Sequence, residues 1–361
     1  MRQLLCLIIF SCFLNSNLFA QKIRSNSIEK TFQLGSFTFE NGYTIPNAYI
    51  KYATYGKLNK ERNNVIVLPS SFGADYTSYA FLMGQNKAID TNKWFVILPE
   101  LFANGRSSSP SNTPYPFDGP RFPQISINDN VIAQYKLIHE FLNISSIKAV
   151  IGFSMGAQQA FQWALNYPSF VQSIVPFCGT AKTYPHGYLR LESAIATIET
   201  DENFKEGDYK YPPMKGLKAW SLHWASWFLS QEWYRKEKYK ELGAKSLIDF
   251  LFMRINADSK ADANDRIAQA LTWQQFDISK NEKFKGNIEK ALSSIHAKIL
   301  YMPSTTDLYF PIEEAAYEKA FLKHITFQPI PSIWGHLAGA GINPDDNKFI
   351  NRHIHSFLTK N

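Results

Sequence analysis

The chain has 361 residues, of which 45% are hydrophobic, 15% are aromatic and 19% are charged, and its net charge is +7. This length and apolar content exclude a disordered chain and suffice for one large core, or for a core with an insertion. The basic residues are scattered. In their densest patch, residues 234–245, glutamates separate them, which predicts a solvated helix face rather than a nucleic-acid site.

Residues 1–20 have the features of a secretory signal peptide. Arg2 supplies a positive charge, residues 4–14 are apolar apart from Ser11, and Ala20 offers a small residue for cleavage. The stretch is shorter than the roughly 20 apolar residues that a membrane span needs. We therefore expect an exported protein, periplasmic or secreted, with no membrane span; the alternative is a buried N-terminal strand. Removing this segment leaves Cys178 as the one cysteine, so no internal disulfide is expected.

The next segments predict an α/β fold. Residues 31–40 and 43–56 are β-rich and flank Asn41-Gly42, which is typical of a hairpin. Short apolar runs of the length of buried parallel strands follow at 64–70, 94–100, 148–154, 172–178, 297–304 and 325–331. A helical pattern over 128–144 has Asn128 or Asp129 as its expected cap. Strands that alternate with helices predict a mostly parallel central sheet flanked by helices.

The interval 182–295 interrupts this alternation, because it is charged, helical and rich in tryptophan and tyrosine. We interpret it as a helical lid inserted into a core made of residues 21–181 and 296–361. An independent helical domain is the alternative. The lid is favoured because two predicted sheet strands follow the interval, which returns the chain to the first core.

A candidate nucleophile lies where a predicted strand meets a predicted helix, in Gly152-Phe153-Ser154-Met155-Gly156. A sharp turn from strand to helix strains the residue at its apex and leaves no room for side chains two positions away. It also places the serine hydroxyl above the amino end of a helix, whose N–H groups stabilise an oxyanion. The motif therefore predicts a nucleophile elbow with Ser154 as its serine; a passive serine in a tight turn is the alternative.

A serine hydroxyl needs a base, and in such folds the order along the chain is serine, acid, histidine. Asp307 follows the predicted strand 297–304, and His336 lies in a glycine-rich loop after the next strand. We predict that Asp307 orients His336 and that His336 exchanges a proton with Ser154. The backbone N–H groups of Met155 and Ser71 are the predicted oxyanion donors, with Ser70 or Phe72 as alternatives to Ser71. No cluster has metal-ligand spacing, and neither metal nor organic cofactor is expected.

With these motifs, the sequence resembles α/β-hydrolases and, more narrowly, the homoserine O-acetyltransferase family. The resemblance covers residue 32 to the C-terminus and is carried by "GFSMGAQQAFQWALNYP", "RFPQISINDNVIAQYKLI", "TDLYFP" and "GH". It implies acyl transfer through an acyl-serine, with Ser154, Asp307 and His336 as triad. Two family features are missing, since Leu337 replaces an Asp after the histidine and "KGLKAWSLHW" lacks a lid Arg. Lys218 or Arg190 is an alternative source of that charge.

We therefore expect an exported serine hydrolase that cleaves a carboxylic ester or related acyl compound, with a small molecule of unspecified acyl length as its substrate. The alternative is an acyltransferase that moves an acyl group from acetyl-CoA, as co-substrate, to an acceptor hydroxyl. A non-catalytic binding protein on the same fold is a third possibility, and the complete triad order argues against it. Substrate contacts are predicted for Phe153, Leu337, Trp220 and Trp224. The sequence does not indicate an oligomeric state.

Overall fold

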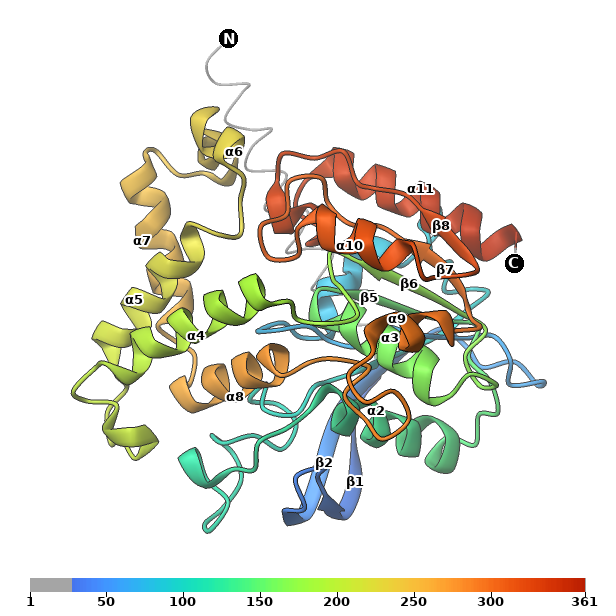
Figure 1. The fold of residues 1–361 in the computed structure, drawn as a ribbon, viewed down its shortest axis with the longest axis horizontal. Helices are drawn as coiled ribbons and strands as arrows, with labels where there is room; N and C mark the ends of the chain where they lie inside the picture. The colour runs from blue at the N-terminus through green and yellow to red at the C-terminus, as the bar shows by residue number, and fades with distance from the viewer. Residues whose placement is uncertain (1–27, 361) are drawn as a thin grey trace.

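A central sheet of eight strands organises the chain (Figure 1). The structure, a computed structural model, describes residues 28–360, so the predicted signal peptide lies outside the described residues. The strand order is β1-β2-β4-β3-β5-β6-β7-β8. The strands are β1 (Ile28–Thr38), β2 (Thr44–Tyr55), β3 (Val65–Val67), β4 (Phe95–Pro99), β5 (Ala149–Phe153), β6 (Ser173–Phe177), β7 (Lys298–Tyr301) and β8 (Ile325–Phe327). Each predicted strand is confirmed.

The sheet is mostly parallel, as predicted. β1 and β2 form the expected antiparallel hairpin, and β2 also runs antiparallel to β4. From β4 to β8, all neighbouring strands are parallel. β5 and β6 are central and buried almost throughout, which explains why their sequences are continuous apolar runs. The carboxyl ends of β5, β6 and β7 consequently open onto one edge of the sheet, where a site is expected.

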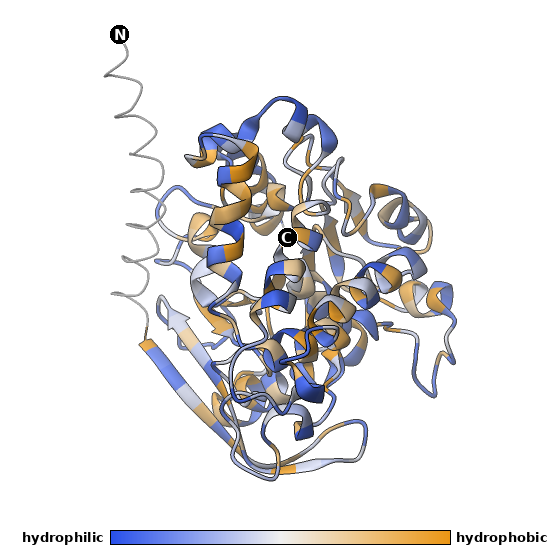
Figure 2. Cartoon of the chain, turned by 90° about the vertical axis from the view of Figure 1, so that its left-hand side faces the viewer, coloured by the Kyte–Doolittle hydropathy of each residue, from blue (hydrophilic) through white to orange (hydrophobic). Residues whose placement is uncertain are grey.

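Helices flank this sheet. In Figure 1, α2 (Ile127–Tyr135), α3 (Met155–Asn166) and α9 (Ile288–Ser293) lie below strands β5–β8, and α11 (Pro344–Lys360) lies above them. α10 (Ile312–Lys319) connects β7 to β8. α11 buries one stripe that includes Ile350, Ile354 and Phe357, while its other residues face solvent. The same mixture of hydrophobic and hydrophilic residues recurs along the surface helices in Figure 2.

The start of α2 differs from the sequence expectation. Neither Asn128 nor Asp129 is the N-cap; Ser126 is, and its hydroxyl accepts a hydrogen bond from the Asp129 N–H at 2.9 Å. The Asp129 carboxylate accepts from the Ser126 N–H at 2.8 Å, which completes a capping box. The helix therefore begins earlier than predicted, because the reciprocal pair satisfies two amide donors. After Tyr135 the helix continues as a π-helix, Lys136–Phe141.

Five α-helices lie between β6 and α9, and α4, α5, α6 and α7 group at the left of Figure 1. They are α4 (Pro185–Glu199), α5 (Met214–Ala225), α6 (Gln231–Arg235), α7 (Leu247–Asp258) and α8 (Ala263–Gln274). The chain enters and leaves this group at an antiparallel bridge between Lys182 and Asp277. The side chains of these two residues also form an ion pair at 2.7 Å. The division into core and lid stays a prediction, and we call helices α4–α8 the lid below.

Candidate functional site

Ser154 occupies the sharp turn between β5 and α3. Its φ and ψ are 57° and −121°, a conformation that L-residues rarely adopt, and the residue is 3% exposed. The Ser154 N–H donates to Phe177 O at 3.1 Å, and its carbonyl accepts from Ala157 and Gln158 in the first turn of α3. Backbone hydrogen bonds thus hold the strained residue from both sides, which fixes the direction of its hydroxyl.

Glycine is required on both sides of this turn. A Cβ at Gly152 would lie 1.9 Å from Gly156 O, and a Cβ at Gly156 would lie 2.6 Å from the Tyr79 hydroxyl. Tyr79 was not anticipated from the sequence, because no local motif marks it. Its hydroxyl accepts from the Phe153 N–H at 3.0 Å and donates to Pro69 O at 2.8 Å. This side chain therefore connects the serine turn to the end of β3.

The structure brings Ser154, His336 and Asp307 together in one hydrogen-bonded row. His336 Nε2 lies 2.9 Å from Ser154 Oγ, and His336 Nδ1 lies 2.8 Å from Asp307 Oδ2. The other carboxylate oxygen, Asp307 Oδ1, accepts from the N–H groups of Tyr309 and Phe310 at 2.8 and 3.2 Å. Both oxygens of the carboxylate are thus engaged, and the row has the order that proton transfer from a serine requires.

The histidine loop is held by the lid. The His336 N–H donates to Phe228 O at 3.0 Å, and the Ser230 hydroxyl donates to Ile333 O at 2.6 Å. Gly335 has a φ of 56°, and a Cβ there would lie 2.7 Å from Phe228 O, so glycine is needed for this close approach. The imidazole also packs against the rings of Phe153 and Tyr309, at centroid distances of 4.8 and 4.5 Å. The ring is therefore fixed on both its edges and its faces.

The loop after β3 was predicted to supply an oxyanion donor. The Ser70 N–H donates to Pro99 O at 3.0 Å and is therefore engaged elsewhere, whereas Ser71 lines the cavity that contains Ser154. Within residues 28–360 the buried Ser71 hydroxyl has no hydrogen-bond partner. Gly73, two residues on, donates its N–H to Gln269 Oε1 in α8 at 2.8 Å. Met155 is the first residue of α3, beside Ser154.

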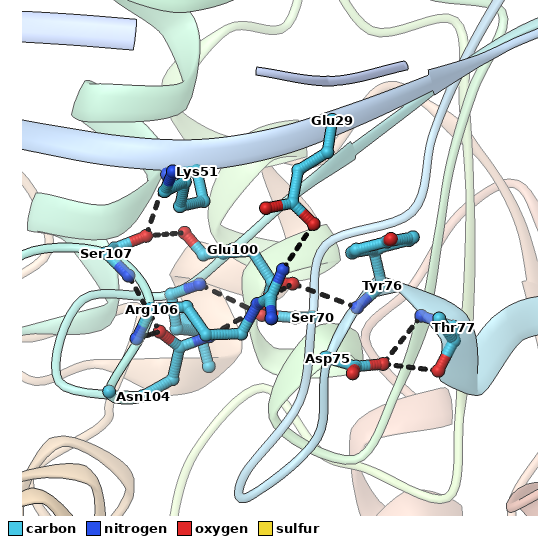
Figure 3. A network of polar contacts seen from close by, with 12 residues as sticks. Glu29, Lys51, Ser70, Asp75, Tyr76, Thr77, Glu100, Asn104, Arg106 and Ser107 are labelled. Atoms are coloured by element: carbon cyan, nitrogen blue, oxygen red, sulfur yellow. Dashed lines mark hydrogen bonds and ion pairs between the residues drawn. The ribbon is translucent and has the colours of Figure 1, made fainter. Parts of the chain in front are cut away.

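A buried carboxylate supports the same loop from behind (Figure 3). Glu100 is 1% exposed, and its Oε1 accepts from the Tyr76 N–H and from Arg106 Nε, both at 3.1 Å. Its Oε2 accepts from Asn104 Nδ2 at 2.7 Å. Burial raises the pKa of Glu100 to about 7, an effect that the Tyr76 N–H and Arg106 partly offset. The loop between β3 and η1 (Tyr76–Leu82) is thus anchored to the end of β4.

A cavity of about 430 Å³ opens above Ser154. Ser154 and His336 line it together with all four residues predicted to contact substrate, which are Phe153, Leu337, Trp220 and Trp224. Its aromatic wall also contains Phe72 and Trp273, whose ring centroids are 6.0 Å apart. A larger groove of about 1500 Å³ between α7 and α11 adjoins the cavity and shares Phe81, Phe228 and Leu337 with it. The cavity size fits a small organic ligand.

Three charged residues that line this cavity were not predicted from the sequence. Arg254 and Asp258 extend from α7, and Arg266 extends from α8. They lack a local motif, and only the packing of the lid brings them together. The two cations considered from the sequence do not line the cavity: Lys218 is exposed, and Arg190 is buried with its Nη1 donating to Leu308 O and Tyr309 O.

Among residues 28–360, no group of three or more His, Cys, Asp or Glu side chains has the geometry to hold a metal ion. In the same part of the chain, every helix is too short or too polar to cross a bilayer.

Comparison with known proteins identifies close structural and sequence relatives. The sequence profile of the alpha/beta hydrolase fold family matches residues 64–338. The ethyl acetate hydrolase of Pseudomonas veronii is 32% identical over 90% of this chain and 94% of its own length. The crystal structure of an acetylester hydrolase from Corynebacterium glutamicum superposes with a TM-score of 0.89, at 29% identity, over 92% of this chain and 96% of that one.

The acyltransferases named by the sequence resemblance are also relatives. The crystal structure of homoserine O-acetyltransferase from Bacillus anthracis superposes with a TM-score of 0.82, at 28% identity, over 92% of this chain and 97% of that one. The resemblance drawn from the sequence motifs is therefore confirmed, and the relatives include both esterases and acetyltransferases. With a matching profile over most of its length and a sheet of the same architecture, this chain belongs to the α/β-hydrolase fold family, in the class of its esterases and homoserine O-acetyltransferases.

Proposed function

We propose that the protein is a serine esterase that hydrolyses carboxylic esters with a short acyl group through an acyl-Ser154 intermediate. The observation that carries the proposal is the hydrogen-bonded row Asp307–His336–Ser154 at the floor of a cavity. In the proposed reaction, Ser154 Oγ attacks the ester carbonyl while His336 Nε2 takes its proton. His336 then protonates the leaving alcohol, and water, activated by the same imidazole, releases the acid and frees Ser154.

The proposed oxyanion donors are the N–H groups of Met155 and Ser71. Met155 follows the nucleophile at the amino end of α3, where N–H groups lack partners in the helix. Ser71 is favoured over Ser70 because the Ser70 N–H is already bonded to Pro99. The Phe72 N–H remains the alternative, since Phe72 also lines the cavity. The aromatic wall limits the space around Ser154, which supports a small acyl group.

We further propose that the protein is exported, on the grounds of the predicted signal peptide in residues 1–20.

Hydrolysis is favoured over acetyl transfer because Leu337 lines the cavity directly beside His336. At this position the resemblance leads one to expect an aspartate for the amino group of homoserine. The reaction as proposed requires neither a metal ion nor an organic cofactor.

The test uses residues 21–361 with an aryl acetate as acyl donor and excess L-homoserine as acceptor. We expect free acetate as the product, and its formation should be lost in Ser154→Ala. Substantial O-acetylhomoserine would instead show that the enzyme is an acyltransferase. A Ser154→Ala variant that keeps full activity would rule out the proposed nucleophile. Ser293→Ala, a change of the same kind in α9 at a residue that lines neither the cavity nor the groove, is the control and should keep wild-type turnover.

A further inference from the structure

Three charged side chains form a group in the wall of the Ser154 cavity, opposite in character to its aromatic lining. They are Arg254, Asp258 and Arg266, and we call Arg254 and Arg266 the arginine pair. Arg254 Nη2 lies 3.3 Å from Asp258 Oδ2, and Arg266 Nη2 lies 3.6 Å from Asp258 Oδ1. Asp258 Oδ2 also accepts from the Ser221 hydroxyl. Both ion pairs are longer than a tight charge-assisted hydrogen bond of about 2.7–2.9 Å. One carboxylate is thus shared loosely between two guanidinium groups.

The arginines retain unused donors. Within residues 28–360, the Nε atoms of Arg254 and Arg266 are buried and have no hydrogen-bond partner. The two side chains are 36% and 16% exposed, so water satisfies little of Arg266. Arg254 packs over Phe228 and Arg266 over Phe72, at 5.1 and 5.6 Å from the ring centroids. A buried guanidinium with an unpaired donor is costly, and an anion that accepts from it would remove that cost.

Within residues 28–360, Asp265 and Asp307 form no ion pair with Arg266, because each is bonded to other groups. Asp265, on the same helix as Arg266, accepts from the Ser111 N–H and hydroxyl at 3.0 and 2.6 Å and does not line the cavity. Asp307 is bonded to His336. Behind the aromatic wall, Arg190 adds a third cation, 4.8 Å from the Tyr309 ring centroid. The cavity wall itself therefore carries two cations and one anion.

The groove that adjoins the cavity also carries an excess of positive charge. Its lining contains Lys87, Lys348 and Arg352 in addition to Arg254, against Glu241 as the acidic residue. A cleft with an excess of one charge concentrates ligands of the opposite charge and speeds their entry. Both the groove and the Ser154 cavity thus favour an anionic ligand.

We propose that the preferred substrates are esters that carry a carboxylate, which the arginine pair binds while Ser154 attacks the ester carbonyl. This inference rests on the proposed function and adds the substrate class. Guanidinium groups bind carboxylates through two parallel hydrogen bonds, and the fixed position of the pair would orient the ester over Ser154. The Ser221 hydroxyl donates to Asp258, and Asp258 in turn holds the arginine pair in place. The Asp258 carboxylate also competes with the substrate carboxylate for the two arginines.

The experiment compares nearly isosteric charged and neutral esters. Acetoxyacetate and acetoxyacetamide differ in charge on the alcohol side; monoethyl succinate and ethyl succinamate differ on the acyl side. In at least one of these two ester comparisons, we expect kcat/KM of the anionic ester to exceed that of the neutral ester by about tenfold or more. Arg254→Met or Arg266→Met should lower this preference by about tenfold to a hundredfold. Asp258→Asn should raise the preference, a gain that general damage to the fold cannot produce. Arg235→Met, an exposed change in α6, is the matched control.

A binding measurement makes the test independent of turnover. Tryptophan fluorescence of Ser154→Ala should respond saturably to succinate, because Trp220, Trp224 and Trp273 line the cavity, and Arg266→Met should weaken that response. Equal kcat/KM for charged and neutral esters, or the absence of a saturable response, would overturn the inference. Ser154-dependent cleavage of an aryl acetate with no preference for charge would overturn the inference alone. Absence of any Ser154-dependent cleavage would overturn the proposed function itself.

Discussion

At the scale of single residues, the orientation of Asp307 determines what His336 can do. Oδ1 accepts from two backbone N–H groups, and Oδ2 faces His336 Nδ1. An acceptor at Nδ1 holds the proton on that nitrogen. His336 Nε2 is then left free to accept from the Ser154 hydroxyl, 2.9 Å away. The two amide donors of Tyr309 and Phe310 therefore act indirectly on Ser154, the proposed nucleophile.

Asp307→Asn tests this relation. The two N–H groups at Oδ1 need an acceptor, so the amide oxygen should take that place and turn its NH₂ group toward His336. The imidazole would then carry its proton on Nε2, the wrong nitrogen to activate Ser154. We expect kcat for an aryl acetate to fall by about 10³–10⁴-fold with a small change in KM. Turnover within tenfold of wild type would contradict the assignment of Asp307.

The residues of the row could be predicted from sequence because each lies in a short motif at the end of a strand. Ser154 is marked by two glycines, and Asp307 and His336 follow the last two strands, β7 and β8, in a fixed order. Arg254 and Arg266 could not be predicted in this way. They lie within helices of the lid, where charged residues are ordinary, and only tertiary packing turns them toward the cavity.

At the scale of elements, α8 holds the loop that carries the proposed oxyanion donor. Gln269 accepts from the Gly73 N–H at 2.8 Å and donates to Ala103 O at 2.7 Å. It is 3% exposed, so water cannot replace either bond. The lid helix is consequently part of the support of the site as well as part of its cover.

Gln269→Ala should therefore lower kcat by roughly tenfold and change KM little, because the loop is displaced but its donors remain. The matched control is Gln274→Ala in the same helix. Gln274 is equally buried, but it donates to Glu192 Oε2, away from the loop. We expect the control to keep its kcat even if it loses a similar amount of stability. Equal losses of kcat in the two variants would remove the special role of Gln269.

The elements themselves follow from the sequence to a large extent. Buried parallel strands read as short apolar runs, and each predicted run became a strand. The start of α2 was less predictable. Ser126 caps the helix instead of Asn128 or Asp129, because the reciprocal bond with Asp129 stabilises an earlier start than the hydrophobic pattern indicates.

At the scale of the whole molecule, buried carboxyl groups make folding depend on pH. Glu318 is fully buried; it accepts from the Ala181 N–H at the base of the lid and from the hydroxyls of Tyr184 and Tyr301. Burial raises its pKa from 4.5 to about 8, although these hydrogen bonds oppose the shift. Since the folded state holds a proton that the unfolded state has released, stability is lost as pH rises from about 4.5 to 8.

Glu318→Gln should reduce this dependence. The amide does not titrate, so the difference in unfolding free energy between variant and wild type should shift in favour of the variant from pH 5 to pH 8. Denaturant unfolding at three pH values within this interval measures it. Glu313→Gln, an exposed change in the same helix, should leave the wild-type dependence unaltered. A difference between Glu318→Gln and wild type that is constant with pH would show that Glu318 is ionised throughout.

The most direct test of the proposed mechanism is to look for the acyl group on Ser154. Residues 21–361 are mixed with an aryl acetate, quenched in acid during the first turnovers and digested for peptide mapping by mass spectrometry. We predict one acetyl group on the peptide that contains Ser154. It should form as rapidly as the initial burst of released phenol and disappear as acetate is produced. Acetate released without acetylation of Ser154, or an acetyl group on another residue, would contradict the mechanism.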